Sequence, residues 1–124
     1  MSISKNYLVM GAVYLLVGVL LGMYMGGSED HSLAPLHAHI NLLGFTLMTI
    51  FGMAYRVMPQ MAESPLAKAQ FWLHQIGALV LLIGLFCLMT GRMFPGLPTP
   101  IMPAAEGAIL LSIVLWLVNL VQRA

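Results

Sequence analysis

The sequence predicts an all-α membrane protein with four transmembrane helices in an up-down bundle. Hydrophobic residues make up 60% of the 124-residue chain and charged residues only 7%, whereas soluble domains carry roughly 25% charged residues. Four separate stretches are apolar over about 20 residues, which is the length that crosses a bilayer as a helix. This composition excludes an ordinary cytosolic enzyme, a disordered tail and a protein that binds nucleic acid through a basic face. The single cysteine, Cys87, excludes an intramolecular disulfide framework.

The four apolar stretches form one domain, residues 1–124, and are joined by connections too short to hold a second one. Short connections force neighbouring helices to run antiparallel, which is the reason for predicting an up-down bundle. No ten-residue segments of alternating hydrophobicity occur, so a membrane β-barrel is not predicted. The predicted helices cover residues 7–26, 35–58, 65–90 and 100–121.

Residues that start and stop helices define these boundaries. Pro35 fits the first turn of the second helix, and Ser64 and Thr99 are each followed by a proline, which is a helix N-cap pattern. Gly26 and Gly91 stand where the first and third helices are expected to end.

The distribution of basic residues predicts the orientation in the membrane. One side carries four Lys or Arg residues and the other side carries one, together with two acidic residues. Because basic residues favour the cytoplasmic side, we expect a protein of the bacterial inner membrane with both termini in the cytoplasm. The four residues are Lys5, Arg56, Lys68 and Arg123, and the opposite side has Arg92, Glu29 and Asp30.

Glycines recur at helical spacing in two of the spans. Gly18, Gly22 and Gly26 repeat every four residues, and a second series, at 77, 84 and 91, repeats every seven. Small residues at such spacing allow helix backbones to approach closely. The series predicts close packing either inside one bundle or between protomers.

A few polar side chains lie within the apolar spans, where they are costly and usually functional. At a rise of about 1.5 Å per residue, two histidines and one glutamate fall at a similar depth near the outer surface. His74 and Gln75 lie deeper, in the third span. His74 is therefore expected to form an interhelical hydrogen bond and not to share an iron with His39. The shallow residues are His37, His39 and Glu106, and Asn41 follows the histidines.

His37 and His39 are two residues apart, so at about 100° per residue they point to nearly opposite faces of a helix. They cannot chelate one ion from a regular helix, but each can serve a different neighbour. An alternative is one buried histidine and one that reaches water near the membrane surface.

The run His37-Ala-His39-Ile-Asn41-Leu-Leu-Gly-Phe45, followed by Ile50-Phe-Gly-Met-Ala-Tyr55 and Pro59, resembles the tenth transmembrane helix of haem-copper oxidase subunit I. The likeness is greatest to the C-type oxidases in the superfamily that includes the nitric oxide reductases. It covers one helix, and the flanking helices share only hydrophobicity.

The resemblance implies that the two histidines ligate two different haems, one on each side of the helix. Carried over by position, His37 resembles the axial ligand of the high-spin haem and His39 that of the low-spin haem. We therefore expect a haem protein, with b-type haem and iron bound by His39 and His37, and with Asn41 and Glu106 nearby. For Glu106 three roles are open. It could accept a hydrogen bond from an imidazole, it could carry a proton, or it could remain solvated near the membrane surface.

The family's subunit contains three pseudo-equivalent groups of four helices, and this chain has the size of one group. The family's copper-binding histidine pair and redox tyrosine are absent, so a complete oxygen-reducing site is not visible and whether the protein is an enzyme stays open. Several copies could instead form a ring that holds haem between subunits. We expect a homo-oligomer, with a trimer favoured over a dimer, that takes electrons from a respiratory-chain donor or binds a diatomic gas.

Two alternatives remain open from the residues. Eleven methionines offer thioether ligands that suit Cu(I), which would fit a copper-handling or oxidase-assembly protein. A structural subunit of a respiratory complex would explain the hydrophobicity but not the histidines. The methionines expected near the outer face are Met23, Met25, Met93 and Met102.

Overall fold

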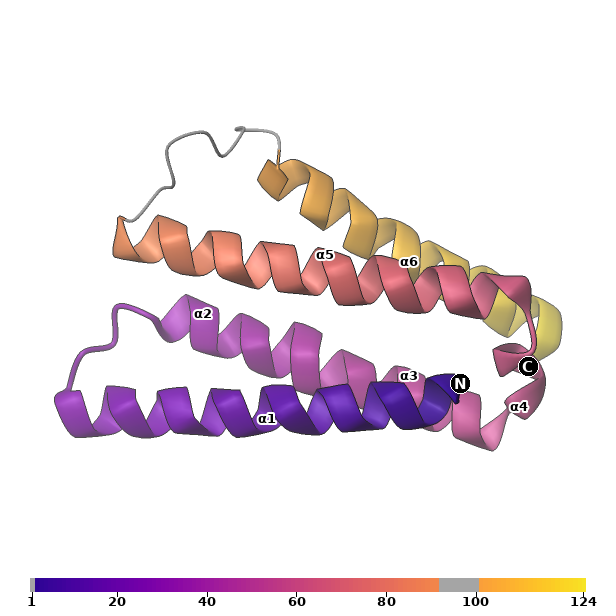
Figure 1. The fold of residues 1–124 in the computed structure, drawn as a ribbon, viewed down its shortest axis with the longest axis horizontal. Helices are drawn as coiled ribbons and strands as arrows, with labels where there is room; N and C mark the ends of the chain where they lie inside the picture. The colour runs from indigo at the N-terminus through magenta and orange to yellow at the C-terminus, as the bar shows by residue number, and fades with distance from the viewer. Residues whose placement is uncertain (1, 92–100) are drawn as a thin grey trace.

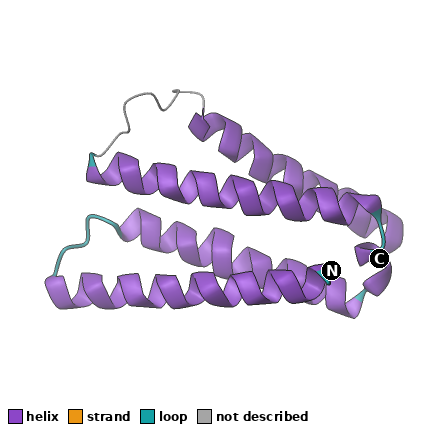
Figure 2. Cartoon of the chain, viewed as in Figure 1, coloured by secondary structure: helices purple, strands orange, loops and turns teal. Residues whose placement is uncertain are grey.

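The computed structural model describes residues 2–91 and 101–124, and almost all of these residues are helical (Figure 2). Four helices in this described part of the chain are long and apolar enough to cross a membrane, which confirms the all-helical class and the four predicted apolar helices. They are Ile3–Ser28, Ala34–Val57, Pro65–Thr90 and Ile101–Arg123.

The second span is not a uniform α-helix. It consists of α2 (Ala34–His39), a π-helical segment η1 (Ile40–Thr46) and α3 (Leu47–Val57). The other elements are α1 (Ile3–Ser28), the short α4 (Pro59–Ala62), α5 (Pro65–Thr90) and α6 (Ile101–Arg123). Both termini and α4 lie at one end of the molecule, here called the terminal end (Figure 1). The loop of residues 29–33 lies at the opposite end, here called the loop end (Figure 1).

Side-chain caps explain where the helices begin. The Ser2 hydroxyl accepts a hydrogen bond from the Lys5 amide, so α1 starts four residues earlier than expected. The Ser64 hydroxyl accepts from the Leu66 amide at 3.2 Å, ahead of a proline in the first turn, as predicted. The predicted cap at Thr99 and Pro100 lies outside the described residues.

The ends of α1 and α5 differ in their stop signals. Gly91 ends α5 in the left-handed region with φ of 68°, as predicted. The prediction for Gly26 was wrong, because α1 continues through it to Ser28 and Glu29 adopts the left-handed conformation with φ of 58°. Glycine permits that conformation without imposing it. Beyond Glu29, Asp30 accepts a hydrogen bond from the Ser32 amide, which lowers the pKa of this loop carboxyl group.

The glycine series pack mainly inside the chain. On α1, the Gly18 position contacts the Asn41 amide, and Gly22 leaves 3.1 Å between a would-be Cβ and the His37 ring. On α5, Gly77 lies against α6 at Ile109, and Gly84 contacts Met102 of α6. These contacts favour the first of the two predicted roles, close packing within one bundle.

A buried hydrogen-bonded cluster, here called the polar hub, joins all four spanning helices. Gln70 of α5 accepts from the Tyr7 hydroxyl of α1 at 2.7 Å and from the Tyr55 hydroxyl of α3 at 3.0 Å. Its amide group donates to the Ser112 hydroxyl of α6 at 3.0 Å. Because lipid offers these groups no partners, the hub fixes how the helix pairs dock.

We predict that Gln70→Ala destabilises the fold by about 2 kcal/mol. The change removes three interhelical hydrogen bonds, and each contributes roughly 0.6 kcal/mol in a membrane protein. Gln75→Ala is the matched control on the same helix, because Gln75 makes only a weak 3.5 Å contact with the Met48 sulfur. Reversible unfolding of both variants in mixed micelles measures the difference. Equal losses in the two variants would contradict a special role for the hub.

Candidate functional site

The π-helical segment begins directly after His39 and holds Asn41. In it, the backbone hydrogen bonds skip one extra residue, so that the Leu47 amide bonds to the Leu42 carbonyl five residues earlier. Such segments are rare and occur often at functional sites. The candidate site is therefore built on α2 and the start of η1, near the loop end.

His74 of α5 stabilises the π-helical segment from the side. Its Nε2 donates to the Leu43 carbonyl at 2.9 Å, which confirms the interhelical hydrogen bond expected for this residue. The ring is fully buried and lies edge-on to Phe51, with ring centroids 5.3 Å apart. Leu43 is one helical turn deeper than His39, and Nε2 of His74 is already engaged, so His74 is placed as a structural residue.

His39 presents an imidazole that is held at Nδ1 and makes no other hydrogen bond within the described ranges 2–91 and 101–124. Its Nδ1 lies 2.7 Å from the Pro35 carbonyl oxygen. Because a carbonyl only accepts, Nδ1 is the donor, and in that neutral tautomer Nε2 keeps its lone pair. The side chain is exposed on α2. A neutral imidazole with Nδ1 bonded to a backbone carbonyl is the arrangement found in metal-ligating histidines.

His37 lies on the other side of α2 and faces α1. Its ring packs beside Gly22, where any larger residue would crowd it. Its Nε2 lies 3.4 Å from the amide nitrogen of Asn41, which is a long contact. Nδ1 of His37 and Oδ1 of Asn41 are buried and find no hydrogen-bond partner in the described part of the chain. His37 and His39 thus point to different sides of the helix, as their spacing predicts. One polar atom of His37 and one of Asn41 are left without a hydrogen-bond partner among the described residues.

Glu106 is not brought to the histidines within one chain. It is exposed on α6, which packs on α5 and α4, whereas α2 packs on α1, η1 and α5. Glu106 was one candidate to accept a hydrogen bond from the His39 imidazole. Nδ1 of His39 donates to the Pro35 carbonyl oxygen instead. Any contact between Glu106 and a histidine therefore requires a second chain or a different arrangement of α6.

The residues described in the structure contain no group of three or more His, Cys, Asp or Glu side chains that could hold a metal ion. The methionines expected near the outer face are spread over the fold. Met23 is exposed on α1, Met25 is buried, and the Met102 sulfur packs against Gly84. Met93 lies outside the described residues. This arrangement does not favour a thioether copper site within one protomer.

No protein-family model, curated protein or solved structure matches this chain. The resemblance of residues 37–59 to an oxidase helix therefore stays a prediction. What it implies must be judged on the geometry of His37, His39 and Asn41.

Sequence analysis did not single out Gln70, Ser112 or Asn119, all of which are fully buried. Asn119 donates to the Met61 carbonyl at 2.9 Å and thereby ties α6 to α4. The sequence did contain a signal for these residues, namely a single amide or hydroxyl side chain within an apolar helix. Such groups need a hydrogen-bond partner on another helix. The π-helical segment left no comparable signal, since it depends on His74 reaching Leu43 across 31 positions of sequence.

We predict that His74→Leu destabilises the protein by about 1–3 kcal/mol, because it leaves the Leu43 carbonyl buried and unpaired. Hydrogen exchange of the amides of residues 40–47 should become faster than in the unaltered protein. His74→Gln, which keeps a donor, should recover part of the loss. His31→Leu in the exposed loop serves as control and should change neither quantity. Unchanged exchange in His74→Leu would show that His74 does not hold the π-helical segment.

Proposed function

We propose that the protein is a membrane haem-binding cytochrome, built as a homo-oligomer that resembles one four-helix module of haem-copper oxidase subunit I. The observation that carries the proposal is the state of His39. Its ring is exposed within an apolar span, its Nδ1 is held by the Pro35 carbonyl, and its Nε2 has no hydrogen bond to any residue that the structure describes. An imidazole facing lipid gains nothing there unless another group covers it.

His39 fits an axial haem ligand, and His37 fits one only in part. The Pro35 carbonyl orients the His39 ring and fixes its tautomer. The His37 ring is turned toward Gly22, and its Nδ1 is an orphaned buried atom. To reach an iron, the His37 ring must turn away from α1. The unsatisfied atoms at His37 and Asn41 support such a change, because turning out would relieve a buried polar group that has no partner.

Each remaining residue has a defined role in this proposal. A b-type haem held by histidines supplies one-electron transfer, or gas binding where one axial position stays open. Asn41, one turn from His37, orients that ring by a hydrogen bond to Nε2 or releases it. Glu106, exposed on α6, supplies a carboxylate to the neighbouring subunit's side of the site. An electron donor of the respiratory chain would complete the electron-transfer role.

The proposed setting is a bacterial inner membrane with both termini in the cytoplasm. The helix ends and the turn that meet at the terminal end hold four basic residues and one acidic residue, which are Lys5, Arg56, Lys68, Arg123 and Glu63. This excess of basic residues supports a cytoplasmic terminal end. The helices then run as an up-down bundle, and the histidines of α2 lie toward the outer surface.

Assembly follows from the divergence of the two histidines. One protomer cannot direct His37 and His39 at the same iron, because they lie about 200° apart around α2. In a closed ring, His37 of one subunit meets His39 of the next at every seam. We favour a trimer because subunit I of the haem-copper oxidases, which the second span resembles, contains three groups of four helices. A twofold dimer is the second choice.

We predict that His39→Ala abolishes or converts the visible spectrum of the detergent-purified, haem-loaded protein while the protein still inserts in the membrane. A six-coordinate cytochrome shows a Soret band with sharp α and β bands on reduction. His31→Ala, in the exposed loop, is the control and should retain the full spectrum. His74→Ala should also retain most of it, because Nε2 of His74 serves Leu43. An unchanged spectrum in both His39→Ala and His37→Ala would refute the haem proposal.

We predict one haem per chain in a trimer, measured by native mass spectrometry in nanodiscs together with iron analysis. A dimer with one haem per two chains would support the twofold arrangement, in which like histidines face each other. A stable monomer that keeps a bis-histidine haem would contradict the inter-subunit site, since α2 would have to unwind to make it.

A further inference from the structure

The α1–α5 groove, a long lipid-facing trough between these two helices, has no part in the proposed haem site. Its terminal-end section, about 450 Å³ in volume, is lined by residues that include Lys5, Asn6, Trp72 and Gln75. Its loop-end section, about 400 Å³, is lined by apolar side chains of α1 and α5 such as Val13 and Leu79, and also by Leu36 of α2 and Ile40 of η1. Met10 lines both sections, so the two sections adjoin at this residue.

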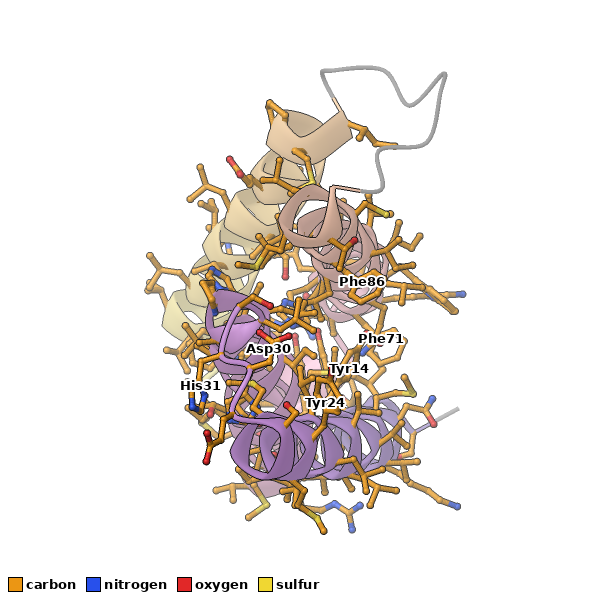
Figure 3. The ribbon with its side chains drawn as sticks, turned by 90° about the vertical axis from the view of Figure 1, so that its left-hand side faces the viewer. Tyr14, Tyr24, Asp30, His31, Phe71 and Phe86 are labelled. Carbon is orange, nitrogen blue, oxygen red and sulfur yellow. The ribbon has the colours of Figure 1, made fainter. Side chains whose placement is uncertain are left out.

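Aromatic side chains mark the length of the groove. Figure 3, viewed from the loop end, shows Tyr14 of α1 with Phe71 and Phe86 of α5 on the same flank of the molecule, away from His31. Trp72 and Phe86 are fourteen residues apart on α5, which is about 21 Å at the rise of an α-helix. One leaflet of a bilayer has a hydrocarbon depth of about 15 Å. The groove is therefore long enough to take a whole acyl chain.

The polarity of the groove changes along its length. Lys5 and Asn6 lie near the start of α1 at the terminal end, and Gln75 lies deeper along α5. Trp72, between them, is of the residue type that is enriched at the membrane surface. The loop-end section is lined almost wholly by hydrocarbon and aromatic rings. A molecule with a polar head and one or two long apolar tails matches this order, with its head at Lys5.

We propose that the α1–α5 groove binds an anionic phospholipid, with its phosphate at Lys5 and one acyl chain along Met10, Val13 and Leu79. Apolar surface alone does not select an occupant in a bilayer, because lipid tails are as apolar as the groove. The charge at the head therefore decides. The helix ends and the turn at the terminal end hold four basic residues and one acidic residue, so an anionic head is attracted there.

The test uses the full chain, delipidated in detergent and incubated with equal amounts of phosphatidylglycerol and phosphatidylcholine of the same acyl chains. Native mass spectrometry counts the lipid that each protein molecule retains. We expect the anionic lipid to be retained about fivefold more, the preference that one basic side chain gives near an anionic lipid. Lys5→Gln should remove most of this preference. Arg123→Gln, which removes a charge at the far end of α6, should keep it.

The groove itself is tested by filling it. Leu79→Trp, or Val13→Trp from the opposite wall, should lower the number of retained lipids of both kinds, whereas Leu88→Trp on the exposed surface of α5 should not. All three positions are exposed, so the fold should tolerate the change. Equal retention of the two lipids by the unaltered chain, or the same loss in Arg123→Gln as in Lys5→Gln, would overturn the proposal. Unchanged lipid retention in both groove variants would also overturn it. If the groove variants change the mass of the oligomer and not the number of retained lipids, the groove binds a second copy of the chain and the proposal is wrong.

Discussion

The polar hub is the interaction on which the arrangement of the four helices depends. Inside a bilayer, helices gain little from burying apolar surface, because lipid is an equally good solvent for it. Gln70 uses both ends of its amide, accepting from Tyr7 and Tyr55 and donating to Ser112. Each partner comes from a different spanning helix, so a single side chain sets the register of three neighbours. The stacked rings of Tyr7 and Tyr55, 6.1 Å apart and nearly parallel, add shape to the same contact.

The hub and the candidate site are connected through His74. This residue follows Gln70 by one helical turn on α5. Its Nε2 donates a hydrogen bond to the carbonyl oxygen of Leu43 in the π-helical segment. A widened turn in lipid would expose backbone groups, which is costly unless the protein itself supplies partners. Once α5 is docked by the hub, His74 supplies one. The segment that starts after His39 is thus held by packing on α5, and the site inherits its shape from a contact made deeper in the bundle.

Two exposed polar groups are the reason for proposing an oligomer. His39 and Glu106 lie on the surface of single helices at membrane depth, and the helices that carry them do not pack on each other within the chain. A protein that left both against lipid would bear a continuous cost. The proposed oligomer covers them, and the proposed lipid occupies a different flank, between α1 and α5. The two proposals therefore concern separate surfaces and succeed or fail separately.

The sequence by itself determined the class of the protein, the four spans, the cap at Ser64, the stop at Gly91 and the divergence of His37 and His39. These features depend on composition, on local hydrogen bonds and on the period of the helix, which neighbouring residues encode. It also suggested the haem ligands, and that prediction is still to be tested by experiment. Only the tertiary structure decided that His39 is oriented by Pro35 and His37 turned toward Gly22, that Glu106 lies apart from both, and that the second span widens into a π-helix. The physical reason is that these outcomes depend on which distant group satisfies each polar atom, and in lipid that choice is made by helix docking and not by local sequence.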